Sequence, residues 1–231
     1  ARPGLATRTL AHLAQAVCTS FPETETHLPT GVARLTGTPV RDLRREAEVR
    51  DPATFTLFIF GGSQGAHQIN IEAVAAVGLL SARIAGLEVI HQTGTKDYET
   101  VAAAYEKAGI RAEVHPFIHD MGAAYARADL VVCRSGSSVA ELTSLGKPAI
   151  LVPYPYAADD HQRANAESLQ QRGAAVMILD RELSGERLAE RVLALAQDRD
   201  RLAEIARRAR DIGRPEAANA VLAVCEDVVG R

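Results

Sequence analysis

The stretch Thr56-Leu57-Phe58-Ile59-Phe60-Gly61-Gly62-Ser63-Gln64-Gly65-Ala66 joins a strongly apolar run to a glycine-rich turn. The apolar run predicts a strand, and the residues after Ala66 predict a helix. Glycines at a strand-to-helix turn let the backbone approach a ligand closely, and the helix directs unpaired N–H groups and its positive dipole end at the turn. The stretch lacks the P-loop and dinucleotide-binding motifs. It therefore predicts a diphosphate cradle around Ser63, with an ordinary strand–helix connection as the alternative.

From Thr56 onward, short apolar runs alternate with stretches of helical periodicity. The expected strands cover residues 56–60, 87–91, 111–115, 129–133, 148–152 and 175–179. The expected helices between them lie near 66–80, 97–108, 120–127, 138–146 and 161–171. Connections of this length suit crossover helices, so the sheet should be parallel, and strands that are apolar on both faces predict helices on both sides. The predicted fold class is α/β, a doubly wound parallel (Rossmann-like) sheet with ligands beyond the carboxyl ends of its strands.

The two ends of the chain differ from this pattern. After residue 180 the periodicity is helical throughout, with Ser184 as an expected N-cap and further helices near 200–211 and 216–229. Residues 1–35 suggest a short helix and a short strand interrupted by prolines. We interpret this segment as the tail of a neighbouring domain, with an extension packed on the same core as the alternative.

Composition excludes several function classes. The 231 residues are 47% apolar and 24% charged, with a formal net charge of −3, so there is no electrostatic reason to expect nucleic acid as a partner. No apolar run approaches the ~20 residues needed to span a bilayer. The three cysteines are far apart and indicate neither a disulfide framework nor a zinc site. His115 and His119 are separated by Pro116, so they are not expected to form a metal pair on one helix face.

Three more polar loops follow predicted strands and should gather at the same sheet edge as Ser63. They cover residues 117–121, 133–141 and 153–162. Glu141, about one turn into its helix, has only acceptor oxygens and suits the two hydroxyls of a ribose, although a carboxylate is also favoured near any helix N-terminus. Arg134 suits a phosphate or, alternatively, a structural ion pair.

The segment from residue 159 to 165 collects polar donors and acceptors before and into a helix. His161, Gln162 and Asn165 suit sugar hydroxyls. Asp159 or Asp160 suits the same purpose, but either is equally expected as the N-cap of the helix.

These stretches together resemble the C-terminal half of the undecaprenyldiphospho-muramoylpentapeptide β-N-acetylglucosaminyltransferases of the MurG type, which act in bacterial cell-wall (peptidoglycan) synthesis. The resemblance extends over nearly the whole chain from Pro3. It rests on seven stretches in the family's order: Thr36-Gly37-Thr38-Pro39-Val40-Arg41, Gly61-Gly62-Ser63-Gln64-Gly65-Ala66, His91-Gln92-Thr93-Gly94, Phe117-Ile118-His119-Asp120-Met121, Arg134-Ser135-Gly136, Val139-Ala140-Glu141-Leu142 and Asp159-Asp160-His161-Gln162-Arg163-Ala164-Asn165-Ala166.

The resemblance implies a GT-B fold of two Rossmann-like domains, with UDP-N-acetylglucosamine bound in the C-terminal one. It also implies six donor-binding residues. They are Arg41 and Ile118 near the uracil (Ile118 through its backbone), Glu141 at the ribose hydroxyls, Ser63 at the diphosphate, and Gln162 and Asn165 at the N-acetylglucosamine hydroxyls. Residues 1–35 would then be a remnant of the N-terminal acceptor domain, 36–214 the UDP-sugar-binding domain, and 215–231 a helix that packs back on the N-terminal domain.

The implied reaction transfers N-acetylglucosamine, with inversion, to undecaprenyl-pyrophosphoryl-MurNAc-pentapeptide, converting lipid I to lipid II without cofactor or metal. The implied location is the cytoplasm, peripheral on the inner face of the bacterial cytoplasmic membrane, with membrane contact mainly through the N-terminal domain. The catalytic base is expected in that domain, which has no counterpart here, so this chain alone is expected to bind donor and hardly to transfer it.

Two departures from the family pattern concern single positions. Thr38 stands where Asn is usual, and the stretch from Arg134 to Glu141 is one residue shorter. A missing residue before a helix rotates the residues of that helix by ~100° unless the loop absorbs the change, which bears on where Glu141 points. The alternative functions are a stand-alone nucleotide-sugar-binding subunit of a split glycosyltransferase and a nucleotide-sugar epimerase; the polar cluster at 159–165 argues against the epimerase.

Overall fold

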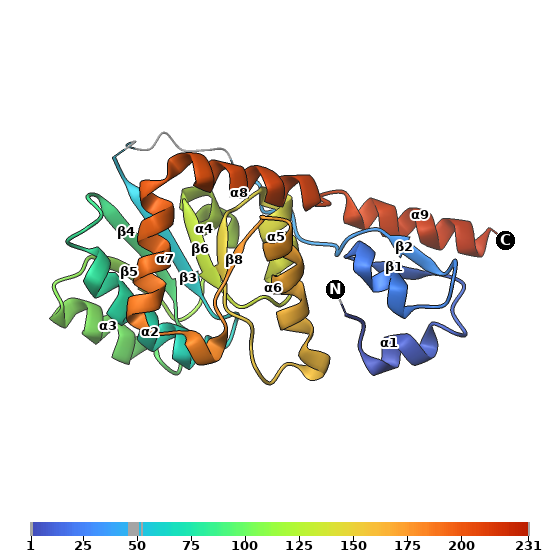
Figure 1. Ribbon diagram of the computed structural model, residues 1–231, viewed down its shortest axis with the longest axis horizontal. Helices are drawn as coiled ribbons and strands as arrows, with labels where there is room; N and C mark the ends of the chain where they lie inside the picture. Colours follow the sequence, from blue (N-terminus) through green and yellow to red (C-terminus); the bar gives the residue numbers. More distant parts are fainter. Residues whose placement is uncertain (1, 46–50, 52, 231) are drawn as a thin grey trace.

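The structure is a computed structural model that describes residues 2–45, 51 and 53–230. Its main body is an α/β domain, and the N-terminal segment forms a small lobe at one end of it (Figure 1). In the part of the chain that the structure describes, none of the helices is long and apolar enough to cross a membrane.

Among the described residues, six strands form one parallel sheet in the order β5-β4-β3-β6-β7-β8. The strands are β3 Phe55–Phe60, β4 Leu87–Gln92, β5 Ala112–His115, β6 Leu130–Cys133, β7 Ala149–Leu151 and β8 Val176–Met177. Each overlaps its predicted strand, and the prediction of a parallel sheet is confirmed.

The strand order reverses between β3 and β6. The chain runs outward from β3 through β4 to β5, and it then returns to the other side of β3 to build β6, β7 and β8. In doubly wound sheets the ligand crevice lies at such a reversal, beyond the carboxyl ends of the strands. Two loops start there, residues 61–66 after β3 and residues 134–137 after β6.

Helices cover both faces of the sheet, as the apolar strands predicted. The crossover helices are α2 His67–Leu80, α3 Tyr98–Lys107, α4 Met121–Arg127, α5 Ser138–Leu145 and α6 His161–Gln171. All of β3 is buried, and its side chains alternate between two cores. Leu57 and Ile59 pack with α2, α3 and the C-terminal helix α7. Phe58 and Phe60 pack with α4, α5 and α6 on the opposite face.

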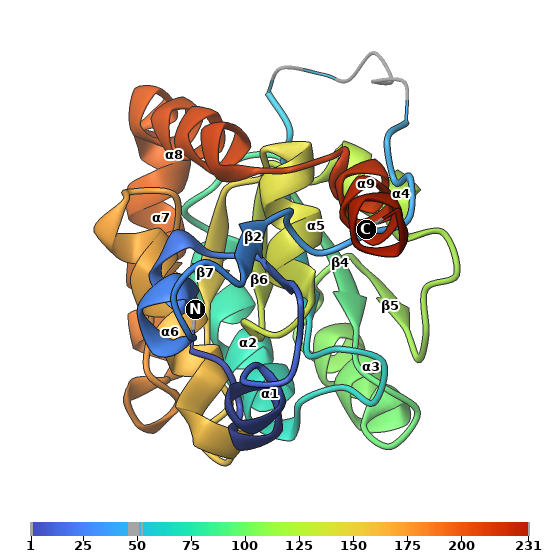
Figure 2. The ribbon, with the colours of Figure 1, turned by 90° about the vertical axis from the view of Figure 1, so that its right-hand side faces the viewer.

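The predicted C-terminal helices are confirmed as α7 Gly185–Gln197, α8 Arg199–Ile212 and α9 Ala217–Val229. The Ser184 hydroxyl accepts a hydrogen bond from the N–H of Arg187 at 3.2 Å, which confirms this residue as the N-cap of α7. Helix α9 extends away from the sheet toward the small lobe, and it is seen end-on in Figure 2.

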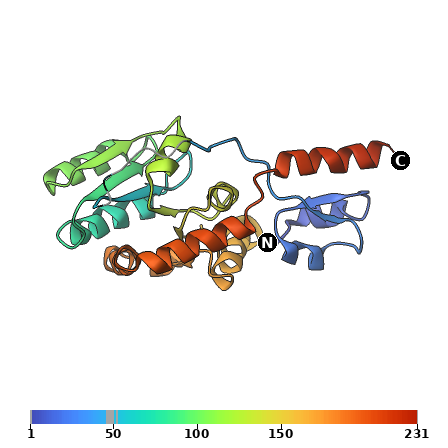
Figure 3. The same ribbon diagram turned by 90° about the horizontal axis from the view of Figure 1, so that it is seen from above.

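The small lobe contains helix α1 (Leu5–Leu10), strand β1 (Val17–Thr19), a 3₁₀ helix (Pro22–His27) and strand β2 (Ala33–Leu35). Strands β1 and β2 pair in parallel with each other and do not join the large sheet. The sequence predicted the helix and β1 but missed β2 and the 3₁₀ helix. Viewed from above, α9 and this lobe occupy the same end of the molecule (Figure 3). The assignment of residues 1–35 to a neighbouring domain stays a prediction.

Contacts join the small lobe to α6 at two points. The Oδ2 atom of Asp159, just before α6, accepts a hydrogen bond from the N–H of Leu5 at 3.2 Å. At the other end of α6, Glu23 pairs with Arg172 and accepts a hydrogen bond from Ser168 at 3.4 Å. The lobe therefore lies against the helix that carries Gln162 and Asn165.

Candidate functional site

The glycine turn between β3 and α2 is shaped by backbone contact with the end of β4. Gly62 and Gly65 adopt φ values of 98° and 76°, and the N–H of Gly65 donates to the carbonyl of Gly62 at 3.0 Å. A Cβ atom on Gly65 would lie 1.8 Å from the carbonyl oxygen of Thr93, so only glycine fits there. Ser63 is exposed in this turn.

Helix α2 begins directly after the turn, and its N-terminus lies beyond the carboxyl end of β3, where doubly wound sheets bind ligands. The N-cap position is occupied by Ala66, and no side chain of the described residues caps the helix. The first N–H groups of α2 are thus left to solvent or to a ligand, and a helix N-terminus favours an anion. The local structure agrees with the predicted diphosphate cradle; that Ser63 binds a ligand stays a prediction.

The side chain of Gln92, at the end of β4, joins the turn to the loop after β5. Its Nε2 donates to the carbonyl of Gly62 at 3.0 Å, and its Oε1 accepts the N–H of Ile118 at 2.7 Å. The residue is only 3% exposed. The structure therefore brings the predicted diphosphate turn and the predicted base-binding residue Ile118 within reach of one amide side chain.

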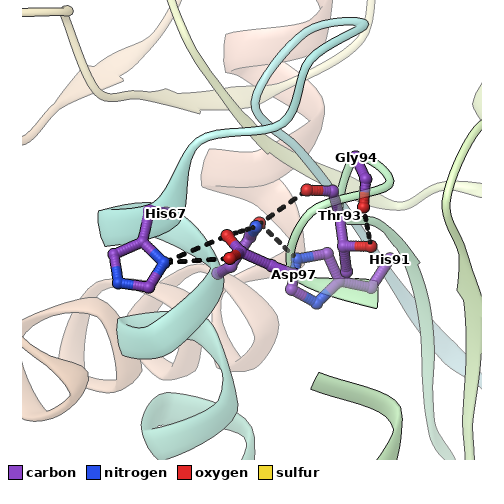
Figure 4. A network of polar contacts seen from close by, with 6 residues as sticks. His67, His91, Thr93, Gly94 and Asp97 are labelled. Atoms are coloured by element: carbon purple, nitrogen blue, oxygen red, sulfur yellow. Dashed lines mark hydrogen bonds and ion pairs between the residues drawn. The ribbon is translucent and has the colours of Figure 1, made fainter. Parts of the chain in front are cut away.

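A network of polar contacts joins α2 to the end of β4 and to the segment that follows it (Figure 4). Asn70 donates from Nδ2 to the carbonyl of Thr93 and to Asp97, both at 2.8 Å, and its Oδ1 lies 3.1 Å from Nε2 of His91. Because the Asn70 oxygen can only accept, His91 must carry its proton on Nε2. Its Nδ1, 3.0 Å from the hydroxyl of Tyr105, then accepts from that hydroxyl.

Burial determines the protonation states in this network. The His91 side chain is fully buried, and burial lowers its pKa to about 3, so the ring is neutral at pH 7. Burial likewise raises the pKa of Tyr105. Although partial burial opposes it, hydrogen bonds from Asn70 and His67 lower the pKa of Asp97.

This network was not predicted from the sequence, although the sequence holds a signal for it. Asn70 is a polar residue at a position of α2 where the helical spacing of Ile69, Ala73 and Val77 puts buried apolar side chains. His91 and Gln92 likewise end a buried strand. Polar residues at core positions require partners, so they indicate a structured network.

Arg41 and Glu141 line the same small pocket, of about 70 Å³. Glu141 is half-buried near the start of α5, and its Oε2 accepts a hydrogen bond from the hydroxyl of Tyr125 at 2.8 Å. Burial, then the neighbouring Cys133 and Glu141, raise the pKa of Tyr125, which therefore remains a donor. Glu141 thus lines one pocket with Arg41, and both residues are predicted to meet the nucleoside; contact with a ribose stays a prediction.

The first turns of α6 carry Gln162 and Asn165. Their side chains form hydrogen bonds with the loops that follow β7 and β6. The Nδ2 of Asn165 donates to the carbonyl of Ser135 at 3.1 Å, and the Oε1 of Gln162 accepts the N–H of Tyr154 at 3.1 Å. Asn165 also lines a cleft of about 460 Å³ between the small lobe and the start of α5. Both amides are half-buried, and that they bind sugar hydroxyls stays a prediction.

Among the residues that the structure describes, neither of the two aspartates before α6 makes the capping hydrogen bond that an N-cap aspartate usually makes. Asp160 occupies the N-cap position, but its side chain makes no capping hydrogen bond with the described residues. Asp159 bonds the small lobe instead, as described above. Both residues have positive φ values, 52° and 55°, which is strained backbone for a residue other than glycine. The predicted N-cap position is therefore confirmed for Asp160, but in the described part of the chain the capping hydrogen bond is absent where the chain turns in a left-handed conformation.

Two roles were predicted for Arg134, a phosphate contact or a structural ion pair, and the structure shows the ion pair. It pairs with Asp180 and donates to the carbonyls of Val152 and Pro153, both at 3.2 Å. Its guanidinium also lies 5.4 Å from the ring centre of Tyr154. These contacts hold the loop after β7 rather than leaving the charge available to a phosphate.

The model of the glycosyltransferase family 28 C-terminal domain matches residues 56–221. A UDP-N-acetylglucosamine–N-acetylmuramyl-(pentapeptide) pyrophosphoryl-undecaprenol N-acetylglucosamine transferase of Geobacter sp. (strain M21) is 43% identical over 96% of the chain. The chain spans 61% of that relative's length. The crystal structure of Acinetobacter baumannii MurG matches with a TM-score of 0.84 and 32% identity, over 98% of this chain and 65% of that one.

A more distant likeness shows the fold alone. The structure of a putative UDP-N-acetylglucosamine 2-epimerase from Listeria monocytogenes matches 95% of this chain and 61% of its own, with a TM-score of 0.72 but only 14% identity. The GT-B type of architecture is thus shared with epimerases, and the higher identities are with transferases.

Proposed function

Because the chain belongs to the family of glycosyltransferase family 28 C-terminal domains, we propose that it binds the UDP-N-acetylglucosamine donor of an N-acetylglucosaminyltransferase. The observation that carries the proposal is the glycine turn at 61–66, which lies at the reversal of strand order and opens directly into α2. Ligands of doubly wound sheets bind at this point, and a diphosphate fits the N-terminus of a helix.

The diphosphate would receive hydrogen bonds from the first N–H groups of α2 and from the hydroxyl of Ser63. The formal net charge of −3 for the whole chain gives no general attraction for anions, so recognition has to come from this local arrangement. The turn is held by backbone contact with Thr93 and by the side chain of Gln92. A cradle that is already rigid loses little conformational entropy when the ligand binds.

The nucleoside and sugar would lie on either side of the diphosphate. We assign the uracil to the backbone of Ile118 with Arg41 nearby, and the ribose hydroxyls to Glu141, because Arg41 and Glu141 share one pocket. We assign the N-acetylglucosamine hydroxyls to Gln162 and Asn165, whose amides lie at the loops that follow β6 and β7. These six residues are a donor-binding set, and none of them is assigned as catalytic base.

The whole protein would transfer N-acetylglucosamine to a lipid-linked muramoyl-pentapeptide, as the names of the relatives state for those proteins. The hydroxyl of the acceptor would attack the anomeric carbon of the donor with inversion, and UDP would leave. The acceptor carries an undecaprenol chain, so the reaction would take place at the inner surface of the cytoplasmic membrane. We propose that residues 36–214 are the donor domain, and that residues 1–35 and the helix at 215–231 belong with the acceptor side; residue 231 lies outside the described residues.

The ribose assignment gives a direct test of this function. UDP should bind the chain about tenfold more tightly than 2′-deoxy-UDP, because a site built for a hydroxyl is left with an unpaired polar group when that hydroxyl is absent, at ~1–3 kcal/mol. Glu141→Ala should remove most of the difference. Both nucleotides are titrated into each variant by isothermal calorimetry.

Tyr125→Phe is the matched control, since it removes the hydroxyl that donates to Glu141 and leaves the carboxylate in place. It should keep the preference for UDP. Equal affinity of the unmutated chain for the two nucleotides would place Glu141 outside the ribose site, and binding of neither would overturn the proposed function.

A further inference from the structure

The side chain of Gln92 links two parts of the proposed donor site, the diphosphate-binding turn and the loop that carries Ile118. It lies at the carboxyl end of β4, next to β3 in the sheet, and Phe60 is its partner in register. One end of its amide donates to the turn at Gly62 and the other accepts the N–H of Ile118. The two bonded segments are 56 residues apart in sequence, between Gly62 and Ile118, and no local pattern relates them.

The chemistry of this bridge is specific to an amide side chain. The Gly62 carbonyl needs a donor and the Ile118 N–H needs an acceptor, and glutamine presents both on one flat group. Glutamate of the same length can only accept when ionised, and leucine can do neither. Because Gln92 is buried, both bonds are made away from bulk water, where an unpaired polar group is costly.

The turn is held at its other end by a separate tie. Asn70, in the first turn of α2, donates to the carbonyl of Thr93, and the Thr93–Gly94 backbone touches Gln64 and Gly65 closely. A Cβ atom on Gly94 would lie 2.2 Å from the carbonyl oxygen of Gln64. Asn70 thus fixes the turn to the end of β4, whereas Gln92 fixes it to the loop that carries Ile118.

We propose that Gln92 is a positioning residue that sets the separation between the base-binding and diphosphate-binding parts of the donor site, and thereby the preference for a uridine nucleotide. This inference rests on the proposed function. Gln92 touches no part of the nucleotide itself; it acts through Gly62 and Ile118. With the separation fixed by Gln92, a nucleotide with a larger base should bind more weakly than UDP. Without the Gln92 bridge, the difference between the two affinities should become smaller.

The test is calorimetric titration of UDP and ADP into the unmutated chain, Gln92→Leu, Gln92→Glu and Asn70→Ala, with thermal unfolding of each to confirm folding. Gln92→Leu should weaken UDP about tenfold or more, as expected when buried hydrogen bonds are lost, and should lower the ratio of UDP to ADP affinity. Gln92→Glu should also weaken UDP and lower the ratio, because a carboxylate oxygen still accepts the N–H of Ile118 but cannot donate to the carbonyl of Gly62. Asn70→Ala should weaken both nucleotides equally.

The ratio separates a positioning role from a structural one, since a general loss of stability weakens both nucleotides together. An unchanged ratio in folded Gln92→Leu overturns the inference while leaving the proposed function intact. If Gln92→Leu does not fold, an unchanged ratio in Gln92→Glu overturns it instead. Absence of any preference for UDP in the unmutated chain overturns the proposed function and this inference together.

Discussion

Gly65→Ala is expected to abolish measurable UDP binding and to lower the free energy of unfolding by ~2–5 kcal/mol. A left-handed φ of 76° costs a residue with a side chain about 1–2 kcal/mol, and forcing extra atoms into a packed site adds about 1–3 kcal/mol. The added Cβ would lie 1.8 Å from the Thr93 carbonyl, which is backbone and cannot rotate away. The turn must therefore move, and the proposed cradle moves with it.

Gly62→Ala is the matched control in the same turn. Gly62 also has a positive φ, of 98°, but apart from its own chain neighbours no atom of the described residues lies within 4 Å of a Cβ built there. Its substitution should lower stability by only about 1–2 kcal/mol, the conformational term alone. Denaturant unfolding and UDP titration are measured for both variants. Equal, small losses in the two would show that contact with Thr93 does not shape the turn.

The stability of the chain is expected to fall steeply in mild acid because of His91. Its pKa of about 3 in the folded protein lies below the ordinary value of 6.5, so the unfolded chain binds a proton that the folded chain does not. The contribution of neutral His91 to the free energy of unfolding is complete above pH 6.5 and is lost as the pH falls toward 3. The loss reaches up to about 5 kcal/mol by linkage, with a slope of up to ~1.4 kcal/mol per pH unit.

His91→Gln separates this effect from the protonation of carboxylates. Glutamine can still accept from Tyr105 and donate to Asn70, but it does not titrate. The variant should be less stable than the unmutated chain at pH 7, and its free energy of unfolding should depend less on pH between 6.5 and 3, by about one bound proton. The same slope in both proteins over that range would show that His91 titrates normally in the folded state.

Local periodicity was sufficient to predict the main sheet. Strand β3 is apolar at every position but one, and the next two strands along the sheet, Leu130–Cys133 and Ala149–Leu151, have the same character, so their burial between two helix layers follows from sequence alone. Strand β2 was missed because Ala33–Leu35 has the charged Arg34 at its centre and forms no apolar run. The fold of the small lobe depends on the pairing of β2 with β1, which the sequence of β2 alone does not predict.

The site was predicted as a set of loops but not as a set of contacts. That Ser63 and Glu141 share one edge of the sheet follows from the carboxyl ends of parallel strands. The bonds that shape the site link residues far apart in sequence, such as Gln92 with Ile118 and Leu5 with Asp159. Asp160 shows the limit of a local rule, because its residue type favours a cap but its left-handed backbone turns the side chain away from that bond.

The most direct test of the proposed donor site is the affinity of the chain for UDP-N-acetylglucosamine with and without the Ser63 hydroxyl. Calorimetric titration of Ser63→Ala should show affinity weaker by about tenfold or more, since hydrogen bonds to charged groups are worth ~1.5–3 kcal/mol. Ser81→Ala, a substitution of the same type at the opposite end of α2, is the control and should bind as the unmutated chain does. Unchanged affinity in folded Ser63→Ala would contradict the account, because the diphosphate would then lie elsewhere than at the start of α2.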